Sequence, residues 1–215
     1  MGAKLHQYEG QSTRVTYDAK RCIHAAECVH GLPDVFDPKA RPWVNPDAAS
    51  AEELAAVVAR CPTGALRLTR LDGGPAEETP TQNTVTIDPN GPLYVHGDVQ
   101  VVDAEGAVVT SDLRIALCRC GASTNKPFCD GKHAEVEFED SGAIPAPQLR
   151  DGDAASGQLK VTLAKNGPLI LDGPLTLQGG EDTCSGSRGA LCRCGASANK
   201  PFCDGAHAKI GFSDA

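Results

Sequence analysis

The chain has 215 residues, a formal net charge of −8 at pH 7 and only 4% aromatic residues, so we expect modest hydrophobic cores. Its acidic balance disfavours nucleic-acid binding, which depends on phosphate neutralisation by Lys and Arg, and no run approaches the ~18 apolar residues of a membrane span. Ten cysteines without an apolar signal segment after Met1 predict metal ligation in a reducing cytoplasm rather than disulfides.

The N-terminal segment begins with polar residues. We expect residues 1–13 to be loose at the start and residues 14–17 to form a short strand. An alanine-rich helix is expected later, because Ser50 and Glu53 form the pattern of a capping box ahead of apolar residues at helical spacing. Cys61 falls at the end of this helix.

Three cysteines give this segment the pattern of a cluster site. Cys22 and Cys28 are separated by five residues, and Cys61 follows more than thirty residues later with a proline directly after it. Three thiolates give a structural zinc ion one ligand too few. We therefore favour a cluster, with a zinc site or three unrelated thiols as the alternatives.

Residues 8–70 resemble the divergent 4Fe-4S mono-cluster family, which is ferredoxin-like. The resemblance is carried by the stretches Cys22-Ile-His, Gly31-Leu-Pro-Asp-Val-Phe-Asp37, Arg41-Pro-Trp43 and Cys61-Pro-Thr-Gly-Ala-Leu66. The fuller ferredoxin pattern has a fourth ligand where this chain has Ala25, and alanine cannot ligate iron. The resemblance therefore implies a [3Fe-4S] cluster, or a [4Fe-4S] cluster whose fourth iron binds water or His24. A polar surface residue is the alternative for His24.

Composition then divides the rest of the chain. Turn-forming residues predict a linker at 72–83, and the pattern changes to strands at 84–87, 93–95 and 99–102. A second set of strands is expected at 159–163 and 169–171. The predicted organisation is a first domain at 1–71, the linker at 72–83, a first unit at 84–140, a connector at 141–157 and a second unit at 158–215.

A sixteen-residue stretch occurs twice in these units. Cys118-Arg-Cys-Gly-Ala-Ser-Thr-Asn-Lys-Pro-Phe-Cys-Asp-Gly-Lys-His133 returns 74 residues later as Cys192-Arg-Cys-Gly-Ala-Ser-Ala-Asn-Lys-Pro-Phe-Cys-Asp-Gly-Ala-His207, with fourteen of sixteen positions identical. Packing tolerates swaps of similar volume, whereas a metal centre fixes ligand type and spacing together. The repeat therefore predicts two metal sites, with the ligands Cys118, Cys120, Cys129 and His133 in one and Cys192, Cys194, Cys203 and His207 in the other.

The spacing of these ligands bears on the metal. Structural zinc sites usually present C-x2-4-C, and the tighter C-x-C suits two sulfurs on one iron of a cluster. Cys129 and His133 would share one face of a helical turn beginning near Cys129, with Asp130 as its cap, and would bind a second iron. Four ligands fit a [2Fe-2S] cluster, and zinc is the alternative.

Both stretches resemble the CDGSH, or NEET, iron-sulfur family. The second copy matches the family motif at every position, and the first departs from it only at Lys132, where the motif has a small residue. The resemblance implies a [2Fe-2S] cluster in each copy and, for two motifs in tandem, a monomeric pseudo-dimer. Because Lys132 places an ammonium group beside His133, we expect the first cluster to be the easier one to reduce.

The predicted fold class is α+β, with a small ferredoxin-like domain followed by two β-rich CDGSH units that form an intramolecular pseudo-dimer. Cys184 is left over and is expected to be a free thiol in a loop. We find no nucleophile–base pair, phosphate loop or supported carboxylate dyad, so we predict no catalysis by this chain alone.

Two functions compete. The favoured function is electron transfer between redox partner proteins, such as a reductase and an oxygenase. The alternative is a cluster carrier or a redox or iron sensor that hands clusters to apo iron-sulfur acceptors.

Overall fold

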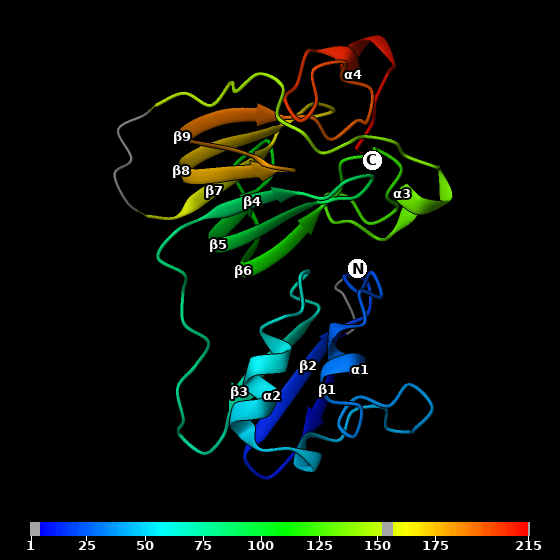
Figure 1. Ribbon diagram of the computed structural model, residues 1–215, viewed down its shortest axis with the longest axis vertical. Helices are drawn as coiled ribbons and strands as arrows, with labels where there is room; N and C mark the ends of the chain where they lie inside the picture. The colour runs from blue at the N-terminus through cyan, green and yellow to red at the C-terminus, as the bar shows by residue number, and fades with distance from the viewer. Residues whose placement is uncertain (1–4, 152–156, 215) are drawn as a thin grey trace. The chain divides into compact units, whose positions relative to one another are not determined.

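The chain folds into two units, Met1–Glu78 and Thr79–Ala215. A computed structural model describes residues 5–151 and 157–214 (Figure 1). Strands dominate and the few helices are short, so the fold is α+β. Within the described residues, no helix is long and apolar enough to cross a membrane.

The first unit is an antiparallel three-stranded sheet with two short α-helices. The strands pair in the order β1-β2-β3. Its elements are β1 (Leu5–Glu9), β2 (Thr13–Asp18), α1 (Glu27–Gly31), the 3-10 helix Pro46–Ala48, α2 (Ala51–Val58) and β3 (Leu66–Arg70). A small core lies beneath α2, where Val15, Phe36 and Leu54 are fully buried.

The start of the chain differs from the expectation. Residues 5–9 form β1, and Leu5 pairs with Asp18 while Glu9 pairs with Arg14 of β2. Strand pairing supplies backbone hydrogen bonds to a segment whose side chains are mostly polar, so the looseness expected at the start does not extend to residues 5–9. Residues 1–4 lie outside the described residues.

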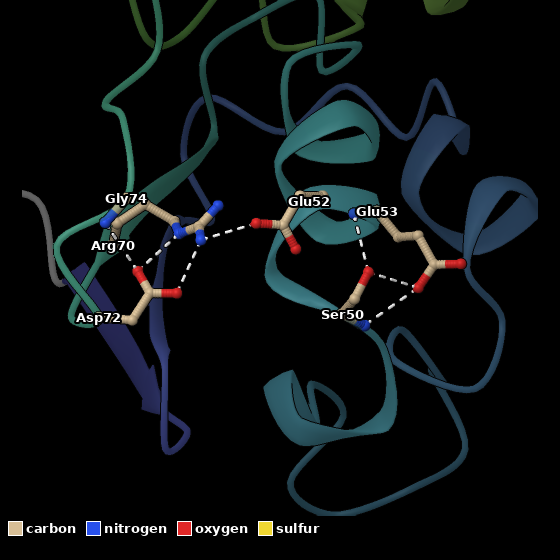
Figure 2. A network of polar contacts seen from close by, with 6 residues as sticks. All are labelled: Ser50, Glu52, Glu53, Arg70, Asp72 and Gly74. Carbon is tan, nitrogen blue, oxygen red and sulfur yellow. Dashed lines mark hydrogen bonds and ion pairs between the residues drawn. The ribbon is translucent and has the colours of Figure 1, made fainter.

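The predicted capping box is confirmed (Figure 2). The Ser50 hydroxyl oxygen accepts from the Glu53 amide at 3.3 Å, and the Glu53 carboxylate accepts from the Ser50 amide at 3.0 Å. The Ser50 hydroxyl also donates to the Glu53 carboxylate at 2.7 Å, and this bond together with the one from the Ser50 amide lowers the pKa of Glu53. The helix ends at Val58, so Cys61 lies three residues beyond it.

An ion-pair network joins the same helix to β3 (Figure 2). Arg70 donates to Glu52 at 2.8 Å and to Asp72 at 2.7 Å. The hydrogen bond from Arg70 is the main reason that the pKa of Asp72 is lowered to about 2. The network connects Asp72, which follows β3, to Glu52 at the start of α2 through Arg70.

The second unit contains one six-stranded sheet to which both repeats contribute three strands. The first repeat supplies β4 (Thr84–Ile87), β5 (Leu93–Val102) and β6 (Val108–Leu117), and the second supplies β7 (Leu159–Leu163), β8 (Leu169–Gly179) and β9 (Asp182–Leu191). Within each repeat all pairings are antiparallel. Between the repeats, β4 pairs with β8 and β5 with β7, both in parallel.

All six strands share one hydrophobic core. Val85, Val99 and Leu117 from the first repeat are buried with Val161 and Leu177 from the second. The helices α3 (Lys132–Glu135) and α4 (Ala206–Lys209) lie beyond the same end of the strands (Figure 1). The shared core therefore brings the two sixteen-residue stretches to one end of the unit.

The expected strands at 84–87 and 159–163 are confirmed by β4 and β7. The two expected at 93–95 and 99–102 form a single strand, β5, with an irregularity between His96 and Val99. The strand expected at 169–171 continues to Gly179. Of the connector, residues 152–156 lie outside the described residues.

Cys184 corrects a further expectation. It lies in β9, not in a loop, and pairs with Leu177 of β8. It packs against the shared core. Pairing with β8 gives this segment its strand structure.

We predict that Ser50→Ala will speed hydrogen exchange of the α2 amides about fivefold, because losing an N-cap costs about 1 kcal/mol. Ser50→Thr, which keeps the hydroxyl, is the control and should exchange nearly as slowly as the parent.

The effect should depend on pH. A lowered pKa means that ionised Glu53 stabilises the helix above its unfolded-state pKa and that this contribution is lost as the pH falls through its folded-state value. The difference in the exchange rate of the α2 amides between Ser50→Ala and the parent should therefore become smaller in acid. An α2 exchange rate unaffected by Ser50→Ala would contradict the capping role.

Candidate metal centres

Each sixteen-residue stretch forms a closed loop at the end of a strand. In the first repeat, the Cys118 amide donates to Pro127 at 2.8 Å and the Cys129 amide donates to Ala116 at 2.9 Å. The second repeat has the same two bonds with the same lengths, from Cys192 to Pro201 and from Cys203 to Ala190. The closure places the second cysteine segment of each loop beside the first.

The ligand candidates meet in pairs. The sulfur atoms of Cys118 and Cys120 are 3.8 Å apart, and the Cys129 sulfur is 3.3 Å from Nδ1 of His133. In the second repeat, the sulfurs of Cys192 and Cys194 are 3.6 Å apart. The Cys203 sulfur is 3.4 Å from Nδ1 of His207.

These distances fit two ligands on one tetrahedral metal. With metal–sulfur bonds of about 2.3 Å, two thiolates on one ion lie about 3.8 Å apart, and a thiolate and an imidazole nitrogen lie about 3.5 Å apart. Among the described residues, no three His, Cys, Asp or Glu side chains gather closely enough to hold a single metal ion. Each pair of donors in the repeats is thus spaced for one metal atom.

The route by which Cys129 meets His133 differs from the expectation. The helix α3 begins at Lys132, with Gly131 as its N-cap at a φ of 87°. Asp130 accepts from the Lys132 amide at 3.2 Å, so it fixes the turn, but Cys129 lies outside the helix. The two ligands meet because the chain turns at Asp130-Gly131, not because they share a helical face.

Burial and mutual contact shape the chemistry of the thiols. The hydrogen bond between Cys118 and Cys120 raises the pKa of Cys118 and lowers that of Cys120 to about 6. Burial raises the pKa of Cys129 to about 11 and also raises those of Cys194 and Cys203. Most of these thiols therefore favour their protons until a cation compensates the thiolate charge, so metal binding releases protons.

The two C-x-C segments touch each other. Cys120 and Cys194 form an antiparallel bridge. Gly121 has a φ of 80° and Gly195 a φ of 82°, and a Cβ atom at either would lie 2.5 Å from the carbonyl oxygen of the facing cysteine. Only glycine fits this approach, so the ligand-bearing C-x-C segment of each repeat packs directly against that of the other.

Lys132 is less free to act on the first site than the sequence indicates. Its ammonium group pairs with Glu135 at 2.5 Å, and this partner raises the pKa of Lys132. The pair offsets the extra charge beside His133. We therefore expect a smaller difference in reduction potential between the two sites than an isolated lysine would give.

The three cysteines of the first unit come from three different elements. Cys22 follows β2, Cys28 lies in α1, and Cys61 follows α2. Burial is the main cause that raises the pKa of Cys28, and the charges of Cys61 and Cys22 raise it further, so the three thiols lie within electrostatic range of one another. Each thiol is half-buried.

Two hydroxyl groups contact this cysteine cluster. The Tyr17 side chain hydrogen-bonds Cys22, and burial together with this bond raises the pKa of Tyr17. The Thr63 hydroxyl lies 3.7 Å from the Cys61 sulfur. His24 is exposed and has a left-handed backbone with a φ of 59°.

The structure also reveals residues that the sequence reasoning missed. Arg119 and Arg193, the middle residues of the C-x-C segments, are buried. The hydroxyls of Ser123 and Ser197 each accept a hydrogen bond from the amide two residues later and donate one to the carbonyl five residues later. These arginines and serines are identical in the two copies of the stretch, and this identity was the sequence signal that could have revealed them. All ten cysteines lie within the described residues, and none forms a disulfide.

Comparison with known families agrees with this arrangement. Residues 8–71 match the family described as divergent 4Fe-4S mono-cluster, and residues 90–134 and 166–208 match the family described as iron-binding zinc finger, CDGSH type. The fold and the paired ligands thus belong to an iron-sulfur protein. The chain belongs to the CDGSH-type family through its two repeats, preceded by a divergent 4Fe-4S mono-cluster domain.

The curated relatives are small. A 60-residue segment is 33% identical to "Uncharacterized protein YjdI" of Escherichia coli strain K12, covering 28% of this chain and 79% of the relative. The protein of the same name from Escherichia coli O157:H7 matches over the same lengths. No solved structure matches.

We predict that Gly121→Ala will lower the iron content of both repeats, because its Cβ atom would press on the backbone of Cys194 in the other one. Backbone strain at a left-handed position costs on the order of 1–3 kcal/mol, and the clash adds to it. Iron per chain and the thermal midpoint of the holo-protein are the measurements.

Gly106→Ala is the matched control. Gly106 has a similar φ of 89°, but a Cβ atom there meets nothing within 4 Å. It should cost stability without selective loss of iron. Equal losses of iron in Gly121→Ala and Gly106→Ala would contradict the contact between the two metal sites.

Proposed function

We propose that the chain is an electron-transfer protein with three clusters. Each CDGSH repeat would hold one [2Fe-2S] cluster through three cysteines and one histidine, and the first unit would hold one [3Fe-4S] or [4Fe-4S] cluster through Cys22, Cys28 and Cys61. In this proposal the first unit is ferredoxin-like, and the two repeats form an intramolecular pseudo-dimer within a monomer.

The observation that carries the proposal is the pairing of ligands. Each repeat offers two donor pairs at the spacing of one tetrahedral metal each, and a [2Fe-2S] cluster takes two protein ligands per iron. A structural zinc ion would need all four donors around one centre. The parallel pairing of β4 with β8 and of β5 with β7 supports the pseudo-dimer.

A bound cluster of this kind supplies one-electron chemistry. Three thiolates and a neutral imidazole leave an oxidised [2Fe-2S] site one charge less negative than four thiolates do, which favours reduction. The residues of the chain hold the cluster, exclude water from Cys118 and Cys192, and leave the histidine side less covered. Redox partner proteins in the cytoplasm, such as a reductase and an oxygenase, are the proposed partners, with no catalysis by the chain itself.

One observation favours the cluster-carrier alternative. A cavity of about 460 Å³ is lined by His133, Glu137 and Phe138 among others, so the histidine side of the first site is open to solvent. An acceptor could reach the iron there. Mixing the holo-protein with an apo-ferredoxin separates the functions: electron transfer leaves the clusters on this chain, and a carrier becomes colourless as the acceptor gains them.

We predict that replacing His133 and His207 together with cysteine will slow acid bleaching of the repeats and lower their reduction potentials. A proton competes with iron for the imidazole lone pair, and a thiolate adds one negative charge to each site. The potentials should also lose most of their pH dependence. Visible absorbance during acidification and potentiometry at several pH values are the measurements.

The cluster of the first unit serves as the internal control, because its three thiolates are unchanged in this variant. Bleaching as fast as the parent, or potentials with the parent's pH dependence, would show that these histidines do not ligate iron.

A further inference from the structure

The arginine inside the first C-x-C segment is buried, and all three of its guanidinium nitrogens donate hydrogen bonds. Only 1% of Arg119 is exposed. Its Nε donates to the carbonyl of Gly91 at 3.0 Å, and one Nη donates to the carbonyl of Asp88 at 2.6 Å. The other Nη donates to the carboxylate of Asp140, and the guanidinium lies over the Phe138 ring at 5.0 Å.

The second repeat builds the same arrangement. Arg193 is 3% exposed and donates to the carbonyls of Gly167 at 2.7 Å and Ala164 at 2.6 Å. It also donates to the carboxylate of Asp214 at 2.5 Å and lies 5.5 Å from the Phe212 ring. Both repeats thus build the same arrangement from a phenylalanine and an aspartate at equal distances after the histidine.

The carboxylates belong to the segments that follow the histidine ligands. We call residues 134–140 and 208–214 the histidine tails. In each tail the phenylalanine amide donates to the carbonyl of the histidine at 2.9 Å, from Phe138 to His133 and from Phe212 to His207. Each guanidinium therefore connects the C-x-C segment on one side of the site to the backbone of the histidine on the other.

We propose that Arg119 and Arg193 are positioning residues that hold the histidine tails and thereby keep each histidine on its iron. The inference rests on the proposed Cys3His ligation. Arg119 and Arg193 do not contact the metal in this account; they act through Asp140 and Asp214 on the segment that carries the ligand.

The ion pair between each arginine and the carboxylate of its histidine tail should be costly to break. A buried guanidinium without its carboxylate is an uncompensated charge, and charge-assisted hydrogen bonds contribute more than neutral ones. Loss of the carboxylate should loosen the tail, while the two remaining hydrogen bonds to carbonyls keep the C-x-C segment attached to the turn before β5 or β8. The histidine side would then open first.

The test uses the full-length holo-protein at neutral pH with excess EDTA. Asp214→Asn should speed loss of the second repeat's cluster about tenfold, so that about half of the [2Fe-2S] absorbance disappears in a new fast phase. Asp140→Asn should do the same to the first repeat. Hydrogen exchange at the Phe212 amide should accelerate in Asp214→Asn while the β8 and β9 amides keep the parent's rates.

The matched control is Asp172→Asn. Asp172 pairs with Arg188 at 3.6 Å in the same repeat, but its side chain is 45% exposed and that of Arg188 is 67% exposed, so its loss should leave cluster release and Phe212 exchange unchanged. A release rate for Asp214→Asn within twofold of the parent would overturn the proposal. So would equal acceleration of the tail and the strands, which would indicate a general structural role.

The exchange measurement also separates this inference from the function on which it rests. Zinc without sulfide in the repeats would contradict the proposed clusters but would still allow the Phe212 exchange test. Slow exchange of the Phe212 amide in Asp214→Asn would overturn the positioning role of Arg193 even if the clusters are as proposed.

Discussion

The parallel pairing of β4 with β8 and of β5 with β7 is the constraint on which the second unit depends. Each repeat supplies only three of the six strands, and the interleaved sheet buries Val85 and Val161 in one cluster. Because the sheet is shared, the two C-x-C segments meet at Cys120 and Cys194. The metal centres are consequently neighbours within one folding unit.

Local hydrogen bonds then convert this frame into ligand pairs. The amides of Cys118 and Cys129 close the loop, Gly131 turns the chain, and His133 arrives beside Cys129 with Nδ1 facing the sulfur. The buried thiols favour protonation, so a bound cation compensates a charge that the protein alone leaves costly. Folding energy and metal affinity are coupled in these loops, which explains how a chain with few aromatic residues supports them.

Much of the site could be predicted from the sequence, because ligand type and spacing are local properties of the repeat. The capping box at Ser50 and the strands β4 and β7 were predictable for the same reason. The expectation failed where hairpin pairing with the neighbouring strand, and not the type of side chain, decides the structure, as for the polar strand β1 and for Cys184 in β9. The role of Arg119 was also hidden, since its partner Asp140 is 21 residues away and its burial follows from the fold.

The central claim is that the paired ligands of the repeats hold two-iron clusters while the first unit holds a larger one. The most direct measurement is iron, acid-labile sulfide and zinc per chain, combined with EPR of the oxidised and reduced protein. The account predicts about seven or eight irons and about eight sulfides per chain, with two [2Fe-2S] signals on reduction and a separate signal from the first unit. Zinc at the repeated sites with no sulfide attributable to them would contradict it.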